Sequence, residues 1–461
     1  MKLANILSPF RESWGRTMQD NSDGLCNSRR GLLCTGLASS IVGALSGGIF
    51  FTTLLLIILK DATTEEYGYF IALNTSIQSL AGATQLIAPF FVEKMRSRRR
   101  LIYTLYGIYH AINLLLLPML TQLPLTVSEK GYIFVTLCGM MSVSTALCGP
   151  TLSIWTLHSL PDTCRSDYFV INSSVGGILS TALSFGLAMF MDFHTANNTA
   201  LFAIILMRCI AIPFVAGEYA ARHYTAEPEY NTGMTNISFL NILRAPFSSP
   251  KFLIAVSISF FWGIIGGFSG TYYAAYLLDG AKLSYTFYSF CGIPATPISI
   301  LMLPFWNKLI RRFGWLRVMA VSMALYGLCY GMNGLVTEQS RWIFLVGSIY
   351  CSLISGGYSL GSSNLSYMFL PDNLRSSCLA FYSICGSISS AFAAFLARQF
   401  YSWSIGYNIT VFGLVLENRA YMCLITCVFM IVEAFFVWWV AVKNEKIPKR
   451  ESAPAAEPVQ A

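Results

Sequence analysis

Charged residues are scarce in this chain. Asp, Glu, Lys and Arg make up 11% of the 461 residues, whereas hydrophobic residues make up 55%, and the mean hydropathy is +0.58. A soluble domain carries about 25% charged residues and has no interior large enough to bury this much apolar surface. The composition therefore excludes an ordinary soluble protein and indicates one that lies in a membrane.

Motifs of enzymes and of ATP-driven pumps are also missing. The sequence contains no HExxH pair and no Walker A loop. Cys423 and Cys427 lie four residues apart without the partners of a zinc site, and nearly all of the 13 cysteines fall inside apolar runs. We therefore expect no enzyme activity, no catalytic residue, no metal site, no cofactor and no disulfide. The four histidines are scattered: His110, His158, His194 and His223.

Twelve apolar runs reach the length of about 20 residues that a helix needs to cross a bilayer. They predict an all-α polytopic membrane protein built from two pseudo-symmetric bundles of six helices. The spans expected in the first half are 31–59, 68–92, 101–123, 131–157, 168–192 and 199–217. Those expected in the second half are 251–278, 284–307, 318–336, 342–369, 378–402 and 419–442.

A short internal repeat supports the division into two halves. The segment LPDTCRS at 160–166 returns as LPDNLRS at 370–376, and each copy follows the fourth apolar run of its own half. Repeated helical halves are typical of secondary transporters, in which the two halves move around a site between them. The repeat therefore points to transport of a small molecule.

The net charge of +8 comes from basic residues in the loops on one side of the predicted spans. The positive-inside rule makes that side cytoplasmic, so both termini are expected in the cytoplasm and the protein in the plasma membrane. Because the loops explain the positive charge, no nucleic-acid partner is expected. The basic residues are Arg29, Arg30, Lys94, Arg96, Arg98, Arg99, Arg100, Lys308, Arg311, Arg312, Arg317, Lys443, Lys446, Lys449 and Arg450.

The pattern of apolar and polar segments predicts five regions. The first span is too long and too apolar to be a cleaved signal, so it should direct membrane insertion itself. We expect a cytoplasmic segment at 1–30, the first bundle at 31–217, a polar cytoplasmic linker at 218–250, the second bundle at 251–442, and a disordered cytoplasmic tail at 443–461.

These features resemble the major facilitator superfamily of transporters. That family has a loop signature between its second and third helices, in which an acidic residue is followed by a basic one. Glu93 and Lys94 match it in the first half, where both glycines of the signature are missing, and Arg312 and Gly314 match it in the second. The resemblance covers residues 31–442 and implies alternating access to a central cavity.

In that family the loop signature is thought to lock the cytoplasmic side. The resemblance therefore suggests Glu93, Lys94, Arg99, Arg312 and Arg317 as gate residues. The repeated LPD loops lie on the same side, and their charged side chains are expected to pair with the basic loops. These side chains are Asp162, Arg165, Asp372 and Arg375. The alternative is that the prolines and acids only end and cap helices, while the arginines mark the cytoplasmic side.

Polar and aromatic residues lie on single faces of three spans that the resemblance places around the cavity. Side-chain amides in hydrocarbon need partners, which are either a solute or neighbouring helices. The candidate solute-binding residues are Asn74, Gln78, Gln85, Trp262, Ser269, Tyr273, Tyr276, Ser355, Tyr358 and Ser362. The alternative for each residue taken singly is packing against another helix.

The spans around the expected cavity carry no central acid or base. Amides, hydroxyls and aromatic rings suit a neutral or zwitterionic solute. The antiporter signatures, an arginine in the fourth helix and Gly-Pro in the fifth, are absent, which disfavours drug efflux. The main prediction is a secondary transporter of a small solute. The alternatives are an efflux carrier for amphipathic compounds and a non-transporting sensor of the same fold.

Two ionisable residues fall deep inside apolar runs. Arg208 lies in span 199–217 and Glu433 in span 419–442. A charge at the centre of a membrane helix costs roughly 2.5–3.5 kcal/mol on insertion scales, so each needs a partner or water. Both are candidates for coupling transport to a proton or a sodium ion. The alternative is that each side chain reaches toward the membrane surface.

Overall fold

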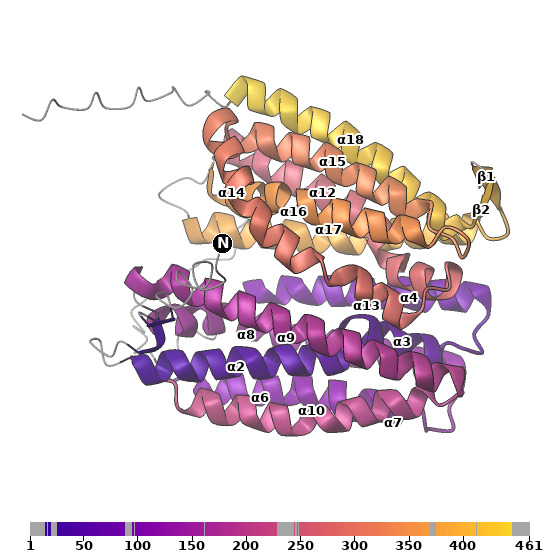
Figure 1. Cartoon of the computed structure of the whole chain (residues 1–461), viewed down its shortest axis with the longest axis horizontal. Helices are drawn as coiled ribbons and strands as arrows, with labels where there is room; N and C mark the ends of the chain where they lie inside the picture. Colours follow the sequence, from indigo (N-terminus) through magenta and orange to yellow (C-terminus); the bar gives the residue numbers. More distant parts are fainter. Residues whose placement is uncertain are drawn as a thin grey trace, which may run out of the picture.

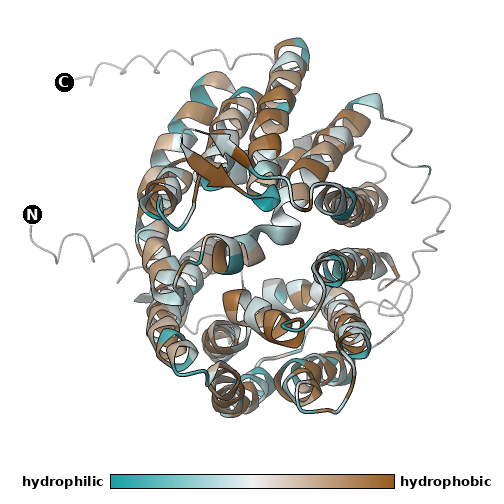
Figure 2. Cartoon of the chain, turned by 90° about the vertical axis from the view of Figure 1, so that its right-hand side faces the viewer, coloured by the Kyte–Doolittle hydropathy of each residue, from teal (hydrophilic) through white to brown (hydrophobic). Residues whose placement is uncertain are grey.

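A computed structural model describes residues 14, 15, 17–19, 25–87, 95, 97–160, 162–227, 244, 247, 249–368, 375–411 and 413–444. These residues form two bundles of roughly parallel helices (Figure 1), which Figure 2 shows end-on. The one small sheet among them pairs β1 (Ile409–Val411) antiparallel with β2 (Leu414–Leu416). The all-α fold predicted from the sequence is confirmed.

The described part of the first half, from Cys26 onward, forms a series of helical segments. They are α2 (Cys26–Ser46), α3 (Gly48–Ile58), α4 (Thr64–Gly82), η1 (Ala83–Leu86), α6 (Arg99–Ala111), η2 (Ile112–Leu116), α7 (Leu117–Leu120), α8 (Val127–His158), α9 (Asp162–Ala196) and α10 (Ala200–His223). The second half contains α12 (Pro250–Ala275), η4 (Tyr276–Gly280), α13 (Tyr285–Gly292), α14 (Ala295–Phe313), α15 (Trp315–Gly334), α16 (Trp342–Met368), α17 (Arg375–Trp403) and α18 (Asn418–Asn444). Each of the twelve predicted spans overlaps one helix or a run of consecutive helices.

The outer surface of the bundles is apolar. Leu301 is 76% exposed and Phe435 71% exposed, and many other large apolar side chains point outward. Nine helices in the described residues are long and apolar enough to cross a membrane, and α13 with α14 adds a tenth span that is bent by 55°. Exposing so large an apolar surface to water is unfavourable, whereas contact with lipid tails is not. The protein is an integral membrane protein.

The predicted span 68–92 corresponds to α4, which is not among the nine apolar helices and lies beside α17 of the other bundle. The two helices pack against each other along the boundary between the bundles (Figure 1). Gly68 allows the close approach, because a Cβ atom there would lie 2.4 Å from the ring of Tyr401. Protein rather than lipid therefore faces their polar sides.

The structure shows which residues begin or interrupt several helices. Thr63 caps α4 in a capping box with Glu66, and hydrogen bonds from Ser128 and Thr63 hold the pKa of Glu66 below its ordinary value. The first span breaks between α2 and α3, where Gly48 adopts φ +54°, a conformation that favours glycine. The third span contains η2, a π-helical turn.

One predicted boundary differs from the structure. α10 continues to His223, so the first residues of the predicted 218–250 linker are helical. Glu218 and Arg222 hold this last part of the helix together with a 3.0 Å ion pair and lie buried within the first bundle. The polar composition that suggested a linker therefore belongs in part to a buried charged cluster.

Candidate functional site

The two ends of the molecule differ in charge and in structure. We call the end that carries β1 and β2 the hairpin end, and the end where α14 meets α15 the basic end. Lys308, Arg311 and Arg312 lie in the last turns of α14 at the basic end and are exposed. α2 begins and α18 finishes at this same end (Figure 1).

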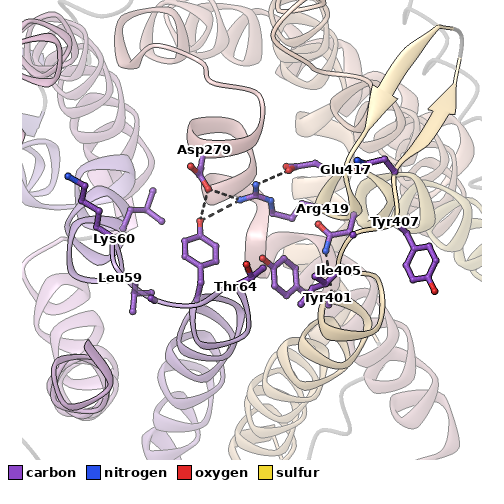
Figure 3. A pocket seen from close by; sticks show the side chains of 15 residues that line it. Leu59, Lys60, Thr64, Asp279, Tyr401, Ile405, Tyr407, Glu417 and Arg419 are labelled. Carbon is purple, nitrogen blue, oxygen red and sulfur yellow. Dashed lines mark hydrogen bonds and ion pairs between the residues drawn. The ribbon is translucent and has the colours of Figure 1, made fainter. Parts of the chain in front are cut away.

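At the hairpin end, Arg419 of α18 joins the two bundles. Its Nη1 lies 3.4 Å from Asp279 Oδ2 and 3.5 Å from the hydroxyl of Tyr67, which comes from the other bundle. Its Nη2 donates to Glu417 Oε2 at 2.9 Å. Tyr67 donates in turn to Asp279 Oδ2 at 3.4 Å. Figure 3 shows Arg419 between Asp279 and Glu417, on the wall of a pocket of about 480 Å³.

A second contact at the hairpin end joins α9 to α13. The Asp192 carboxylate at the end of α9 accepts hydrogen bonds from the backbone N–H groups of Tyr285 and Thr286, at 2.9 and 2.8 Å. These are among the N–H groups that a helix leaves without an internal partner at its start, and a negative charge there is favourable. A residue of the first bundle thus caps a helix of the second.

Aromatic contacts complete the closure of this end. Tyr272 donates to the carbonyl oxygen of Gly68 at 2.7 Å across the two bundles. The Arg398 guanidinium lies 4.5 Å from the centre of the Tyr69 ring, again across the bundles. Polar, aromatic and charged contacts therefore hold the two bundles together at the hairpin end.

The Asp192 contact allows a test with a matched control. Asp192→Ala removes the cap between the bundles, whereas Ser284→Ala removes the Ser284 hydroxyl, which accepts from Phe287 N within the same helix of the second bundle. Loss of an N-cap costs about 0.5–2 kcal/mol. We expect both variants to lower thermal stability, but only Asp192→Ala to widen the hairpin end.

The measurement is the distance between spin labels attached to p-acetylphenylalanine at positions 60 and 407. Lys60 and Tyr407 belong to different halves of the chain and both line the hairpin-end pocket (Figure 3). A longer distance in Asp192→Ala than in Ser284→Ala would support the assignment. Equal distance distributions in the two variants would show that Asp192 only stabilises α13.

Between α4 and α8 lies a polar groove of about 570 Å³. It begins beyond the closed hairpin end and continues along α4 toward the basic end. Two of the predicted solute-binding residues, Gln78 and Gln85, line it with hydroxyl groups from both helices. The Gln78 amide donates to Asn74 Oδ1 at 2.9 Å, so Asn74 supports the groove from behind. The other lining residues are Thr75, Ser79, Gly82, Ser142, Thr145, Ala146 and Gly149.

Several polar groups of this groove have no hydrogen-bond partner among the residues that the structure describes. Among the described residues, the side chains of Ser79, Gln85 and Ser142 make no hydrogen bond, while Thr75 and Thr145 bond only to carbonyls of their own helices. Unpaired amide and hydroxyl groups in a groove are available to a polar ligand or to water. The groove is the candidate functional site of the first bundle.

In the second bundle the predicted face divides into two parts. Trp262 of α12 stacks on Tyr358 of α16 with ring centres 4.3 Å apart, and both rings contact Tyr326. These rings are only partly buried, as is Ser355, which lies 3.5 Å from Ser299. Ser362 is also partly exposed.

The other part of that face lies in the core. The Tyr276 hydroxyl donates to the carbonyl oxygen of Val336, and Tyr273 packs in the same apolar cluster. Ser269 is 2% exposed. Helical periodicity places residues on one face, but it does not say which neighbour that face meets. The cluster of Trp262 with Tyr358 is the partly exposed part of the predicted face, and both rings also pack against an apolar core cluster of the second bundle.

Most of the predicted gate lies outside the described side chains. The structure does not describe Glu93, Lys94 or Asp372, and it describes only the backbone at Asp162, Arg165 and Arg375, where α9 and α17 begin. Arg312 lies beside the Phe313 ring, with 5.1 Å to the ring centre. Arg317 is buried to an intermediate degree near the start of α15.

Arg99 is the predicted gate residue with the best-defined contacts. Its Nη2 donates to the carbonyl oxygen of Thr225 at 2.9 Å, and its Nε lies 3.9 Å from Glu227 Oε2. Its guanidinium also lies 5.5 Å from the centre of the Trp155 ring. These contacts join α6 to the segment after α10 within the first half. Pairing between the two halves at the basic end stays a prediction.

The two predicted intramembrane charges have different surroundings. Arg208 is 0% exposed and donates through Nη1 to the backbone carbonyl and, at 2.7 Å, to the Oδ1 of Asn113 in the π-helical turn η2. Asn113 in turn donates to Ser46 Oγ at 3.0 Å. Glu433 is 5% exposed, and both of its carboxylate oxygens lack a hydrogen-bond partner among the described residues. Arg208 is held in place, whereas Glu433 is not.

Sequence reasoning missed a further buried cluster. His110 Nε2 lies 3.7 Å from Glu218 Oε2, and Arg222 lies over the Tyr106 ring at 4.9 Å. The cluster joins α6 to the end of α10. A signal was present, because Glu218 and Arg222 are four residues apart and suit one helical face. The polar residues that follow them in the sequence led instead to the prediction of a linker.

Comparisons with known proteins show which fold these features belong to. No protein-family model matches the sequence, and no curated protein matches it. The solved nucleoside transporter NupG matches over 91% of this chain and 99% of its own, with a TM-score of 0.62 and 12% identity. The inward open conformation of the xylose transporter XylE from E. coli matches over 90% of this chain and 95% of its own, with a TM-score of 0.60 and 14% identity.

The POT family transporter PepTSo matches over 90% of this chain and 98% of its own, with a TM-score of 0.65 and 11% identity. These similarities extend over nearly the whole of each chain. They show that the protein has the major facilitator fold, which confirms the fold expected from the resemblance.

Proposed function

We propose that this protein is a secondary active transporter that moves a small neutral or zwitterionic solute by alternating access. The observation that carries the proposal is the asymmetry of the boundary between the bundles. Contacts across it close the hairpin end, while a polar groove with hydroxyl and amide groups that are unpaired among the described residues lies deeper along α4. A site closed from one side is what alternating access requires.

The basic end would be cytoplasmic by the positive-inside rule, with the plasma membrane as the location. In that orientation the conformation described here is closed toward the outside. One of the similar structures is an inward open conformation, that of XylE. All of the similar structures named above are transporters, which supports transport rather than an enzyme activity.

In this proposal the solute meets polar groups of the first bundle and aromatic rings of the second. Gln78, Gln85 and the α8 hydroxyls would supply hydrogen bonds, and the rings of Trp262 and Tyr358 a flat apolar surface. The groove lining contains no charged side chain among the described residues, which favours a solute without net charge. The solutes that the similar proteins carry, nucleosides and xylose, are polar small molecules of this kind.

Coupling to an ion is the remaining part of the proposal. A proton or a sodium ion would drive transport, since the sequence contains no nucleotide-binding loop. Arg208 is held by Asn113 and is better explained as a structural charge. Glu433 is the better coupling candidate of the two. The basic loops, including Arg99 and Arg312, would close the opposite end during the other half of the cycle.

The proposal is tested by binding and then by uptake. A panel of neutral and zwitterionic solutes is screened for thermal stabilisation of the purified protein, since a ligand of dissociation constant Kd adds RT ln(1 + [L]/Kd) to stability. Solutes that bind are then offered to proteoliposomes. Uptake driven by a pH or sodium gradient would support transport. Binding without uptake would point to a sensor, and neither binding nor uptake would overturn the proposal.

The groove makes a specific prediction for Gln85. Gln85→Leu removes an exposed amide that makes no hydrogen bond among the described residues, so folding should be unaffected. The loss of an average hydrogen bond to the solute, worth about 1 kcal/mol, should raise KM about fivefold. Gln122→Leu, an amide exposed at the hairpin end, is the control. An unchanged KM for uptake in Gln85→Leu would remove this residue from the site.

A further inference from the structure

A second cavity lies on the membrane-facing surface of the second bundle. It is a groove of about 530 Å³ between α12 and α18, and α17 contributes one side chain. Its walls include Phe261, Phe268, Phe429 and Val432, and three of these four are more than half exposed on the lipid side. A molecule dissolved in the bilayer therefore has direct access to this groove.

Glu433 is the one charged side chain among the described residues that line this groove. Its carboxylate oxygens are buried and have no hydrogen-bond partner among the described residues. The groove's one hydroxyl, on Thr426, already donates to the carbonyl oxygen of Ile265 at 3.2 Å. The groove thus combines a large apolar wall with an acidic group whose partner is missing.

The apolar walls and the unpaired carboxylate indicate which kind of ligand the groove binds. A buried carboxylate without a partner is unfavourable, and a cation that also donates hydrogen bonds removes that penalty. A lipid acyl chain would fill the apolar volume but leave Glu433 unpaired. A volume of about 530 Å³ is within the range of sites for small organic ligands, about 300–1,000 Å³.

We propose that this groove binds a lipophilic amine that enters from the bilayer. The protonated amine pairs with Glu433, and the apolar body lies against Phe261 and Phe429. Pairing requires a rotation of the Glu433 side chain toward the groove, because its oxygens are buried. This site is separate from the groove between α4 and α8 but uses Glu433, the coupling candidate of the proposed function; amine binding itself is measured without transport.

Binding is measured with tritiated 4-phenylbutylamine on the full-length protein in phosphatidylcholine nanodiscs, with empty nanodiscs to subtract partitioning into lipid. We expect saturable binding that excess unlabelled amine displaces and that 4-phenylbutanol, which has the same apolar body without the charge, does not. Glu433→Gln is expected to weaken binding at least about tenfold, which corresponds to about 1.4 kcal/mol.

Two tryptophan variants form a matched pair. Phe429→Trp narrows the groove and keeps Glu433, whereas Phe435→Trp places the same ring on a lipid-facing position of α18 outside the groove. We expect only Phe429→Trp to reduce amine binding. Because both variants retain Glu433, comparing them tests the location of the amine even if Glu433→Gln folds poorly.

Three results would overturn the proposal. The first is equal displacement by the alcohol and the amine, which would show a groove that takes any apolar chain. The second is unchanged binding in a well-folded Glu433→Gln variant, and the third is equal binding in the two tryptophan variants, which would place the amine elsewhere. Failure of the uptake assay would leave this binding measurement unaffected.

Discussion

Replacing Arg419 with alanine shifts the protein toward a state that is open at the hairpin end and lowers solute accumulation by about tenfold. Arg419 is 8% exposed and contacts Asp279, Glu417 and Tyr67 as well as the carbonyl oxygen of Ala275. Alanine removes all of these contacts together. Only the contact with Tyr67 crosses the boundary between the bundles, and Arg419 also holds Asp279, which accepts a hydrogen bond from Tyr67. These links to Tyr67 form only while the hairpin end is closed, so their loss weakens that state of the cycle.

The size of this effect follows from the burial of the partners. The Asp279 side chain is 59% exposed, so solvent weakens its attraction to Arg419, whereas the hydrogen bonds to Tyr67 and to the carbonyl oxygen of Ala275 are better shielded. A loss of about 1–2 kcal/mol from the closed state changes the ratio of the two states by about 5- to 30-fold. The spin-label distance between positions 60 and 407 should increase accordingly.

The matched control is Arg341→Ala. Arg341 also pairs with an acid in a loop at the hairpin end, but its 3.5 Å contact with Glu338 is exposed on both sides and stays within one bundle. Exposed pairs of this kind contribute about 0–1 kcal/mol. The 60–407 distance should therefore stay unchanged in Arg341→Ala. A closed hairpin end in Arg419→Ala, equal to that of the control, would contradict the role of Arg419.

Replacing Asn113 with leucine is expected to destabilise the protein by about 2 kcal/mol, because it removes a hydrogen-bond acceptor from a buried charge. The Asn113 Oδ1 lies 2.7 Å from Arg208 Nη1, and no other side chain in the described residues accepts from this guanidinium. The backbone carbonyl of Asn113 alone would then have to satisfy the charge. Reversible unfolding in mixed detergent micelles measures the change.

Arg208→Met provides the informative comparison. It removes the charge itself, and a methionine chain of similar length fills the space, so we expect a smaller loss than in Asn113→Leu. In the double variant Asn113→Leu with Arg208→Met, part of the loss should be recovered. If Arg208→Met is the most destabilising of the three, then Arg208 makes a larger contribution than its contacts indicate.

The sequence predicted the fold well because the relevant signals are local. Long apolar runs specify helices in a membrane, and each predicted span overlaps helical structure. The groove between α4 and α8 was also partly predictable, because Gln78 and Gln85 are amides in an apolar span and need a polar environment. What periodicity did not reveal is the neighbour of each face, which is why Tyr276 was placed on a cavity and lies in the core.

The closed hairpin end was not predicted, and the reason is physical. Arg419 and Asp279 are far apart in the sequence and meet only when the second bundle folds, while Asp192 meets α13 only when the two bundles associate. One sequence signal was nevertheless present. Arg419 stands at the start of a span on the side that the positive-inside rule leaves poor in positive charge. A basic residue on that side indicates an acidic partner nearby.

The polarity of α4 has a consequence for how the protein is made. Helices enter the bilayer one after another during synthesis, and each is admitted according to its own apolarity. α4 is too polar to be stable in lipid alone, but its neighbour α8 is made soon after it. α17 emerges about 300 residues later and contacts both α4 and α12. We therefore expect α4 to enter the bilayer together with α8 and to gain α17 as a second neighbour only after the second half of the chain has been made.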